Sequence, residues 1–468
     1  MFRTGIVSLA SYIPSTRIRG AEIAKFWGGG GNGEHAVCGS DEDAVTMAVA
    51  AAERLLKHAG IAASAIDFIC LATISGPYVE QSASNVVALA LGAREDVLTA
   101  DHGGSPRAAT TALLDCLGAV ESGRARLGLV ICSDYRIAEP GSELEKILGA
   151  GAVALLVGQE HLAIAIEATA NVTDLFVDRW REDGGEFVKE YDLRFHRQHG
   201  FGDAVSRAVS SVCEKAKLSL GDAARVVMAQ PHRGYLDCAK ALKINSDQLA
   251  GTDVIKKFGD LGTASALIAL GQLEGTRVDD RVVLVNYGAG SADAFVLRIL
   301  KPGRLETADN AKAEYLTYEQ LIKNKQLLRK EYVIPPLSVP PISPYLWRSR
   351  KEMLQLVGGK CCQCGAVNFP QSLRKICIKC GGVEFSEVKL SRTGKIHTYC
   401  VNHYMPDGFD VPLPFIIADM DDGSRYASLG SGVDSKAIQI GDSVRLELRK
   451  YSAERGVSTY GYKFVPDV

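Results

Sequence analysis

Four cysteines in two close pairs constrain this chain more than any other feature of its sequence. Cys361-x-x-Cys364 is followed, after twelve residues, by Cys377-x-x-Cys380. Two thiolate pairs at this spacing are typical of a tetrahedral zinc site, and four thiolates leave no open position on the metal, which indicates a structural role. Cys362 is an alternative ligand, but the C-x-x-C register favours Cys361. The sequence therefore predicts a zinc-held module near the end of the chain.

Composition excludes several classes of protein. Lys plus Arg number 53 and Asp plus Glu 55, so the net charge is −2, which argues against a general nucleic-acid or anionic-membrane binder. The first residues lack the apolar core and cleavage site of a signal peptide. No stretch approaches the roughly 20 apolar residues that span a bilayer. Because scattered cysteines are a hazard in oxidising compartments, we expect a cytoplasmic protein.

The first 302 residues alternate apolar strands with amphipathic helices. This order indicates a parallel or mixed sheet with helices on both faces. Residues 41–56 predict a helix, with acidic residues at its start followed by alanine-rich amphipathic spacing. The alternation of strands and helices in residues 1–165 is repeated in residues 166–302, which suggests an internal duplication.

The sequence changes character after residue 302. Residues 303–345 join a charged, helix-forming stretch to the proline-rich stretch VIPPLSVPPISPYL, which favours extended chain, and we place the domain boundary in this linker. The cysteine pairs occupy residues 346–388. Residues 389–468 contain five short predicted strands separated by turns, which fits a small barrel of the OB type.

Several blocks of sequence resemble the hydroxymethylglutaryl-CoA synthase branch of the thiolase superfamily, to which ketoacyl-ACP synthase III is closely related. These blocks are DEDAVTMAVAAAERLLKHAGI, SGPYVEQSASNVVALALG, ESGRARLGLVICSD, EPGSELEKILGAGAVALLVG and VNYGAGSADAF. The resemblance covers residues 1–300 and implies an α/β fold, a duplicated thiolase-like α-β-α-β-α body. CCQCGAVNFPQSLRKICIKCGG and the β-rich tail resemble zinc-ribbon/OB-fold proteins that accompany acyl-CoA enzymes, which implies a rubredoxin-like zinc ribbon and an OB-fold β-barrel.

The catalytic positions depart from the family pattern. The synthases use a cysteine at the start of a buried helix, where a lowered thiol pKa favours the attacking thiolate. Here that segment reads ADHGGSPRAATTALL, so the position falls on Pro106, or on Ser105 with a one-residue gap. The histidine, glutamate and asparagine that the resemblance implies fall on Ala229, Ile74 and Asp260.

Two interpretations of Ser105 remain open. It is a nucleophile that needs an adjacent base, for which the sequence offers His232 or His102, or it fills the space of the lost cysteine. The resemblance also implies that the Gly288-Ala289-Gly290 turn lies near the acyl chain or supplies oxyanion N–H groups. It thus implies a cavity shaped for a CoA thioester.

Three functions are consistent with these observations. The first is a synthase-like subunit of an acyl-CoA thiolase or acyltransferase complex, which forms a homodimer and docks a separate thiolase subunit through its zinc/OB module. The second is a self-sufficient acyltransferase, or C–C bond-forming or bond-cleaving enzyme, that acts on acyl-CoA with Ser105 and His232. The third is a nucleic-acid-binding OB module, against which the charge balance argues. Its basic and aromatic residues would be Arg392, Lys395, Arg425, Arg445, Arg449, Tyr399, Tyr404 and Tyr426.

Overall fold

The chain forms two compact units. The computed structural model describes residues 4–191, 193–229, 234–301, 313–327, 342–405, 411–454 and 457–467. Unit 1 comprises Met1–Cys38 and Asp43–Leu321, and unit 2 comprises Gly39–Glu42 and Ile322–Val468. The finer division of each unit that the sequence suggests stays a prediction.

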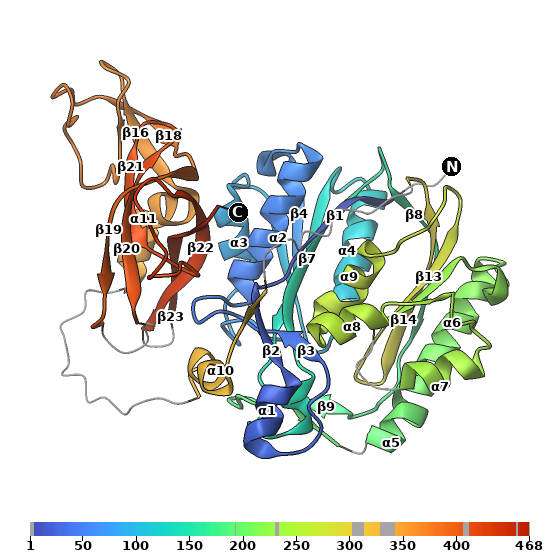
Figure 1. Ribbon diagram of the computed structural model, residues 1–468. Coiled ribbons are helices and arrows are strands. Elements are labelled where there is room, and N and C mark those ends of the chain that lie inside the picture. Colours follow the sequence, from blue (N-terminus) through green and yellow to red (C-terminus); the bar gives the residue numbers. More distant parts are fainter. Residues whose placement is uncertain are drawn as a thin grey trace. The chain divides into compact units, whose positions relative to one another are not determined.

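A ten-stranded sheet runs through unit 1, and its two halves share one strand order (Figure 1). The first half pairs in the order β5-β4-β6-β7-β1, and the second in the order β12-β11-β13-β14-β8. In both halves the first three strands of this order are parallel to one another, and the fourth is antiparallel to both of its neighbours. The repeated order and direction agree with the expected duplication. The strands are β1 (Gly5–Tyr12), β4 (Phe68–Ala72), β5 (Leu98–His102), β6 (Gly128–Tyr135), β7 (Ala150–Gly158), β8 (Ile164–Val172), β11 (Arg225–Met228), β12 (Leu249–Ala250), β13 (Arg281–Gly288) and β14 (Ser291–Ile299).

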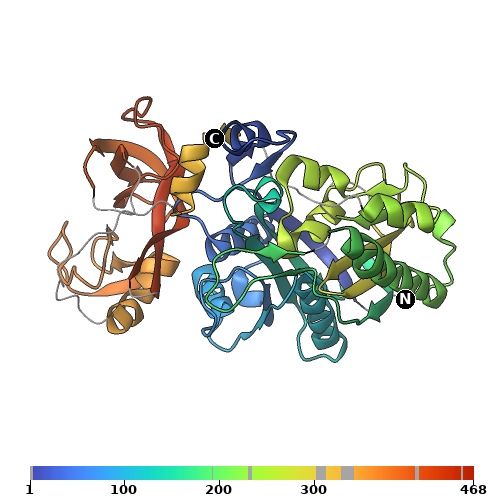
Figure 2. The ribbon, with the colours of Figure 1, turned by 90° about the horizontal axis from the view of Figure 1, so that it is seen from below.

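Helices cover both faces of each half. The first half contributes α2 (Ala44–Ala59), α3 (Ala83–Leu91) and α4 (Ala108–Glu121), and the second contributes α6 (Asp203–Lys215), α7 (Gly234–Ala241), α8 (Thr252–Phe258) and α9 (Ser265–Gly271). Side chains of α4 and α9 belong to one buried cluster, while α6 packs on the other face of β8 and β14. The layers therefore follow the predicted α-β-α-β-α order. In Figure 2 the green helices of the second half gather at one side of unit 1.

Shorter elements complete unit 1. A small sheet pairs in the order β15-β2-β3, and a separate two-stranded sheet joins β9 to β10. The charged stretch predicted as helix forms a strand at its start and a short helix, α10, after it. The bounds are β2 (Thr16–Arg19), α1 (Gly20–Trp27), β3 (Glu34–Ala36), β9 (Arg179–Trp180), β10 (Lys189–Glu190), α5 (Leu193–Phe195), a π-helical turn (His196–Gly202), β15 (Glu314–Tyr315) and α10 (Tyr318–Asn324).

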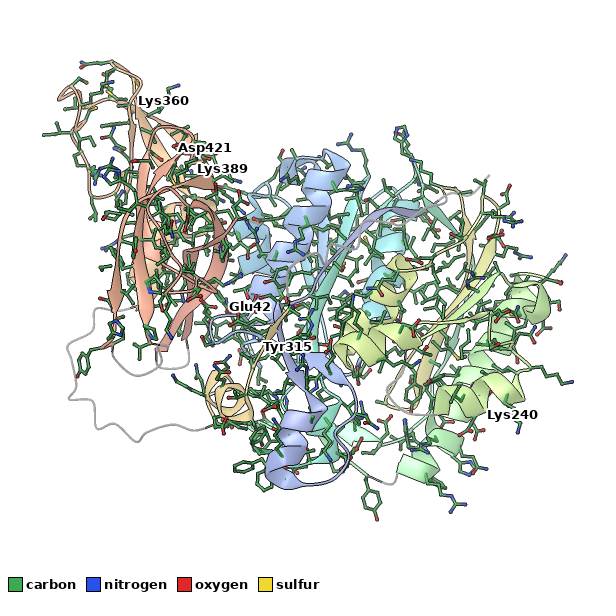
Figure 3. All side chains as sticks on the ribbon, in the orientation of Figure 1. Glu42, Lys240, Tyr315, Lys360, Lys389 and Asp421 are labelled. Atoms are coloured by element: carbon green, nitrogen blue, oxygen red, sulfur yellow. The ribbon has the colours of Figure 1, made fainter. Side chains whose placement is uncertain are left out.

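Unit 2 contains the two predicted small folds. A three-stranded sheet, β17-β16-β18, carries the cysteine pairs, and Lys360 and Lys389 mark two of its strands in Figure 3. A five-stranded sheet, β21-β20-β19-β22-β23, is nearly closed into a barrel by a bridge between Gly430 and Phe464. The five predicted strands are confirmed. The bounds are β16 (Val357–Cys361), β17 (Val367–Asn368), β18 (Phe385–Lys389), β19 (Thr393–Asn402), β20 (Leu413–Met420), β21 (Arg425–Leu429), β22 (Ser443–Glu454) and β23 (Val457–Pro466).

The end of the proline-rich stretch differs in secondary structure from the prediction. The proline-rich stretch was expected to be extended throughout, but helix α11 (Ile342–Gln355) includes its last residues. Pro344 then lies in the first turn of α11, where a proline removes no intrahelical hydrogen bond and is tolerated. The other residues of this stretch, up to residue 341, lie outside the described part of the chain.

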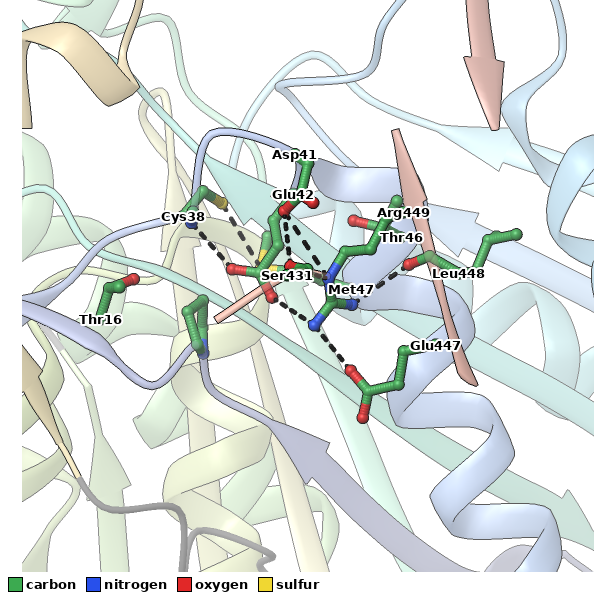
Figure 4. A network of polar contacts seen from close by, with 12 residues as sticks. Thr16, Cys38, Asp41, Glu42, Thr46, Met47, Ser431, Glu447, Leu448 and Arg449 are labelled. Atoms are coloured by element: carbon green, nitrogen blue, oxygen red, sulfur yellow. Dashed lines mark hydrogen bonds and ion pairs between the residues drawn. The ribbon is translucent and has the colours of Figure 1, made fainter. Parts of the chain in front are cut away.

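A buried charge network inside unit 2 uses the segment Gly39–Glu42 (Figure 4). Lys463 Nζ lies 2.8 Å from Asp41 Oδ2, and Arg449 Nη2 lies 3.5 Å from Glu42 Oε1. Arg449 also pairs with Glu447 at 2.7 Å. These basic side chains therefore neutralise acids within the unit rather than forming a basic outer surface.

Helix α2 starts later in the chain than the sequence predicts, and its first turn is capped. The helix begins at Ala44 rather than near residue 41, because Asp43 is its N-cap. Asp43 Oδ1 accepts hydrogen bonds from the backbone N–H groups of Val45 and Thr46, both at 3.0 Å, and Thr46 Oγ1 accepts the Asp43 N–H at 2.9 Å. This capping box satisfies N–H groups that would otherwise be buried without partners.

Replacing Asp43 with alanine tests the cap. We expect Asp43→Ala to lower the free energy of unfolding by about 1–2 kcal/mol, because the N–H groups of α2 lose their acceptor. Urea denaturation followed by circular dichroism measures the loss, and Lys57→Ala, at an exposed position of the same helix, serves as the control. Equal stability of the two variants would contradict the assignment.

Candidate functional site

Ser105 lies where the resemblance places the nucleophile. It is half-buried in the turn between β5 and α4, and its carbonyl accepts the Ala108 N–H at 2.9 Å. The turn between β13 and β14 comes very close to it. A Cβ atom on Gly288 would stand 2.8 Å from Ser105 Oγ and 2.9 Å from the Arg107 nitrogen, so only glycine fits there. The structure therefore brings Ser105 and the Gly288-Ala289-Gly290 turn together.

A buried carboxylate holds these two elements in contact. Asp293, on β14, accepts hydrogen bonds from Arg107 Nε at 2.9 Å, Thr110 Oγ1 at 2.7 Å and Asn171 Nδ2 at 2.7 Å. Its side chain is 1% exposed. Because the first turn of α4 is tied to β14 and β8 by one fully partnered group, the position of Ser105 is fixed by the fold.

The described residues supply no base to Ser105, whose hydroxyl makes no hydrogen bond among them. His102 Nε2 instead faces Asp115 Oδ2 at 3.6 Å. Burial lowers the pKa of His102, an effect that Asp115 and Asp101 oppose. His232 lies outside the described residues, and Ala229, the family histidine position, is a buried alanine.

A second buried histidine pairs with an acid but faces elsewhere. His196 Nδ1 lies 3.2 Å from Asp178 Oδ2, and its ring centre is 5.6 Å from that of Tyr287. Burial lowers the pKa of His196, although Asp178 opposes the change. Successive side chains of a strand point to opposite faces, so Tyr287 and the neighbouring Gly288 face different layers. His196 therefore does not replace the missing base of Ser105.

The end of β6 organises the loop that carries Ile74, the family glutamate position. Asp134 is fully buried and accepts hydrogen bonds from Thr73 Oγ1 at 3.0 Å, Ile74 N at 2.8 Å and Ser75 Oγ at 2.8 Å. It also accepts the Thr263 N–H at 2.8 Å. Asp134 thus joins the loop after β4 to the segment before α9, and it uses its oxygens for structure.

Two arginines converge on Asp260, the family asparagine position. Arg136 Nη2 lies 2.7 Å from Asp260 Oδ1, and Arg179 Nη1 lies 2.8 Å from Asp260 Oδ2. Burial alone would raise the pKa of Asp260, but the two guanidinium groups outweigh it and hold that pKa well below its usual range. Asp260 is therefore an ion-paired carboxylate that cannot donate a hydrogen bond as an asparagine amide does.

Sequence reasoning missed both arginines. Neither Arg136 nor Arg179 belongs to a motif, and they lie far from Asp260 along the chain. The usable signal was Asp260 itself, because an acid at a buried position that normally holds an amide requires a cationic partner.

The four cysteines of the zinc prediction come together in unit 2. All four sulfur atoms lie within 4.8 Å of one another, with Cys361 and Cys380 3.6 Å apart and Cys364 and Cys377 3.6 Å apart. A tetrahedral zinc ion with Zn–S bonds of about 2.3 Å sets its sulfur atoms about 3.8 Å apart, so the cluster fits this metal. A hydrogen bond from the Lys379 N–H helps to lower the pKa of Cys377 to about 6, which favours the thiolate. Cys362 is exposed and lies outside the cluster.

Comparison with curated proteins settles the family. The chain is 30% identical over 346 residues to the hydroxymethylglutaryl-CoA synthase of Pyrobaculum arsenaticum, covering 70% of this chain and 99% of that protein. The chain belongs to the hydroxymethylglutaryl-CoA synthase family. The corresponding enzyme of Archaeoglobus fulgidus is 32% identical over 306 residues, covering 63% of this chain and 89% of the relative.

Solved structures and a family model agree with the two-part fold. A hydroxymethylglutaryl-CoA synthase complexed with CoA superposes with a TM-score of 0.63 at 21% identity, over 69% of this chain and 90% of that one. The 3-oxoacyl-[acyl-carrier-protein] synthase III of Aquifex aeolicus gives a TM-score of 0.57 at 21% identity, over 63% and 99%. Residues 387–449 match the family described as the C-terminal OB-fold domain of ChsH2. No helix in the described ranges is long and apolar enough to cross a membrane.

Metal analysis tests the cysteine cluster. We expect the purified chain to carry one zinc ion, and Cys364→Ser to lose it, because removal of one thiolate opens the tetrahedral shell. Cys362→Ser is the matched control and keeps the metal. Elemental analysis by mass spectrometry gives the zinc content, and equal zinc loss in both variants would show that the ligand set is different.

Proposed function

We propose that unit 1 binds an acyl-CoA thioester without the cysteine chemistry of its relatives, and that the chain is a subunit of an acyl-CoA thiolase or acyltransferase complex. The observation that carries the proposal is that the polar groups of the site are unactivated or already paired. Ser105 keeps the family position at the start of α4 but has no base among the described residues, and Asp260 is neutralised by Arg136 and Arg179. A site whose chemical groups are absent from the described residues or occupied by ion pairs suits binding more than turnover.

The site retains the features that receive a thioester. Ser105 lies just before the N-terminus of α4, the end of a helix at which backbone N–H groups and the positive end of the dipole are found. The glycine turn at Gly288 adds backbone at close range. Such groups polarise a thioester carbonyl oxygen without proton transfer. Related structures were solved in complex with CoA and with 3-hydroxy-3-methylglutaryl coenzyme A, which supports the same ligand class here.

Unit 2 is proposed to dock a separate thiolase, with zinc in a structural role. Its zinc ribbon exposes several aliphatic side chains, and exposed apolar clusters are typical of protein contacts. These are Leu373, Ile376, Ile378 and Val383.

Nucleic-acid binding has less support. Arg425 pairs with Asp419 at 2.7 Å, Arg445 pairs with Glu447, and Tyr426 is largely buried. Three of the five basic side chains named for this function, Arg425, Arg445 and Arg449, therefore have acidic partners within the unit.

One observation favours the self-sufficient enzyme as a second candidate. Ser105 lies at a helix N-terminus, where a developing alkoxide is stabilised, and its activation would then depend on His232.

Acylation distinguishes the two candidates. We expect no covalent adduct on the wild-type chain after incubation with acetyl-CoA or acetoacetyl-CoA, because the Ser105 hydroxyl has no base among the described residues. Intact-mass spectrometry measures the adduct, with Ser105→Ala as the control. An acyl adduct that appears on the wild type and disappears in Ser105→Ala would overturn the subunit proposal and establish the enzyme.

CoA affinity tests the binding site itself. We expect Gly288→Ala to weaken CoA binding by about tenfold or more, since its Cβ displaces the start of α4. Gly118→Ala, on the same helix but facing open space, is the matched control. Isothermal titration calorimetry measures the dissociation constants, and an unchanged affinity in Gly288→Ala would place the ligand elsewhere.

The proposed complex has its own test. The chain and the thiolase encoded in the same genome are purified together and separately, and thiolase activity is measured for each preparation. We expect full activity only from the pair. A thiolase that is fully active without this chain would remove the proposed role.

The homodimer prediction rests on the edge strand β5. In the parallel pair with β4, Leu98 N–H bonds to Asp67 O, so the Thr99 N–H points outward from the sheet. We expect Thr99→Pro to shift a dimer toward monomer, because proline removes that outward donor. Light scattering after size exclusion gives the mass of the particle. Thr99→Val, which keeps the backbone N–H group, serves as the control. A monomeric wild type would contradict the prediction.

A further inference from the structure

A small hairpin stands apart from the main sheet of unit 1. Strands β9 and β10 pair only with each other, with Trp180 opposite Lys189 and Arg179 opposite Glu190. Of the residues between them, 181–186 are exposed, whereas Val188 is half-buried and packs against the small cluster of Ala138, Leu144 and Leu148. The hairpin therefore touches the buried core mainly at Val188, and polar contacts fix the rest of its position.

Those contacts all reach the end of the sheet where the candidate site lies. Arg181 Nη2 donates to Ile74 O at 2.9 Å, and Val188 N donates to Ile137 O at 2.9 Å. Ile74 follows β4 and Ile137 follows β6, and these strands are parallel. Ser105 follows β5, the parallel neighbour of β4, so it belongs to the same edge. The hairpin thus covers loops at the carboxyl ends of the parallel strands, where ligands of α/β sheets bind.

The third contact is the ion pair between Arg179 and Asp260, and both partners have a second counter-ion. Asp260 keeps Arg136 at 2.7 Å, and Arg179 keeps Glu190 at 3.2 Å, which lies on the hairpin itself. If the hairpin moves away, neither charge is left unpaired in the interior. Breaking a buried pair is costly mainly when it leaves an uncompensated charge, so this arrangement permits opening.

We propose that the β9–β10 hairpin is a lid over the thioester site and that the Arg179–Asp260 ion pair is its latch. This inference rests on the proposed function, since it gives the lid a ligand to admit. Open, the hairpin exposes the loops around Ile74 and Ile137. Closed, it shields them from water. Asp260 at the family asparagine position is then explained as a part of the latch.

The chain contains a built-in reporter of this movement. Trp180 lies on β9 next to Arg179, and the only other tryptophans in the sequence are Trp27 and Trp347. Replacing those two with phenylalanine leaves Trp180 as the single indole. Its quenching by acrylamide then measures how often the hairpin is exposed.

The latch is tested in this single-tryptophan background. Arg179→Gln removes the charge, Arg179→Lys retains it, and Lys189→Gln removes a different ion pair of the same hairpin, with Glu182 at 2.8 Å. We expect Arg179→Gln to raise the acrylamide quenching constant of Trp180 about twofold, Arg179→Lys to raise it less, and Lys189→Gln to leave it unchanged.

Hydrogen exchange gives an independent readout. The Val188 amide, bonded to Ile137 O, should exchange about tenfold faster in Arg179→Gln than in Lys189→Gln, with equal thermal midpoints. Asp260→Asn, which keeps the side-chain shape, is the second variant and should act in the same direction. If Arg179→Gln and Asp260→Asn match Lys189→Gln in both quenching and exchange, the lid is overturned.

These two measurements need no ligand, so they separate the lid from the proposed function. A third, stopped-flow association of CoA, should be faster in Arg179→Gln than in Lys189→Gln. Faster quenching and exchange in a chain that does not bind CoA would keep the lid and reject the acyl-CoA site. CoA binding with an immobile hairpin would do the reverse.

Discussion

The contact between the start of α4 and the β13–β14 turn is the constraint on which the site depends. The two elements come from different halves of the duplicated sheet, and Asp293 ties them together through Arg107 and Thr110. No side chain is tolerated at Gly288, because Ser105 and the Arg107 backbone occupy the space. The geometry around Ser105 is thus held by backbone packing and by one buried carboxylate.

Electrostatics imposes a second constraint at the same edge of the sheet. A carboxylate at Asp260 could not stay buried alone, so it is accompanied by Arg136 and Arg179. The charge of Asp260 is therefore balanced by one residue that directly follows β6 and by one on the hairpin after β8. The Arg179–Asp260 pair can open without leaving an uncompensated charge, because Asp260 keeps Arg136 and Arg179 keeps Glu190.

Much of the fold could be predicted from the sequence, because it depends on local periodicity and on short motifs. Alternating strands and helices gave the duplicated sheet, and the spacing of Cys361, Cys364, Cys377 and Cys380 gave the sulfur cluster. The site was predictable only in part. Ser105 and the Gly288 turn follow from motif positions, whereas Arg179 meets Asp260 across 81 residues of sequence. No local pattern encodes such a contact, and the start of α11 at Ile342 was missed because a proline in a first helical turn reads like an extended segment.

The identical strand order of the two halves has a consequence for how the site is built. α4 and α9 occupy equivalent places, so the loops that precede them, with Ser105 in one and Asp260 in the other, are structural counterparts. A duplicated fold contains each such loop position twice. The loop before α9 can carry a charge network while the loop before α4 keeps its packing, and both are supported by the same strand order.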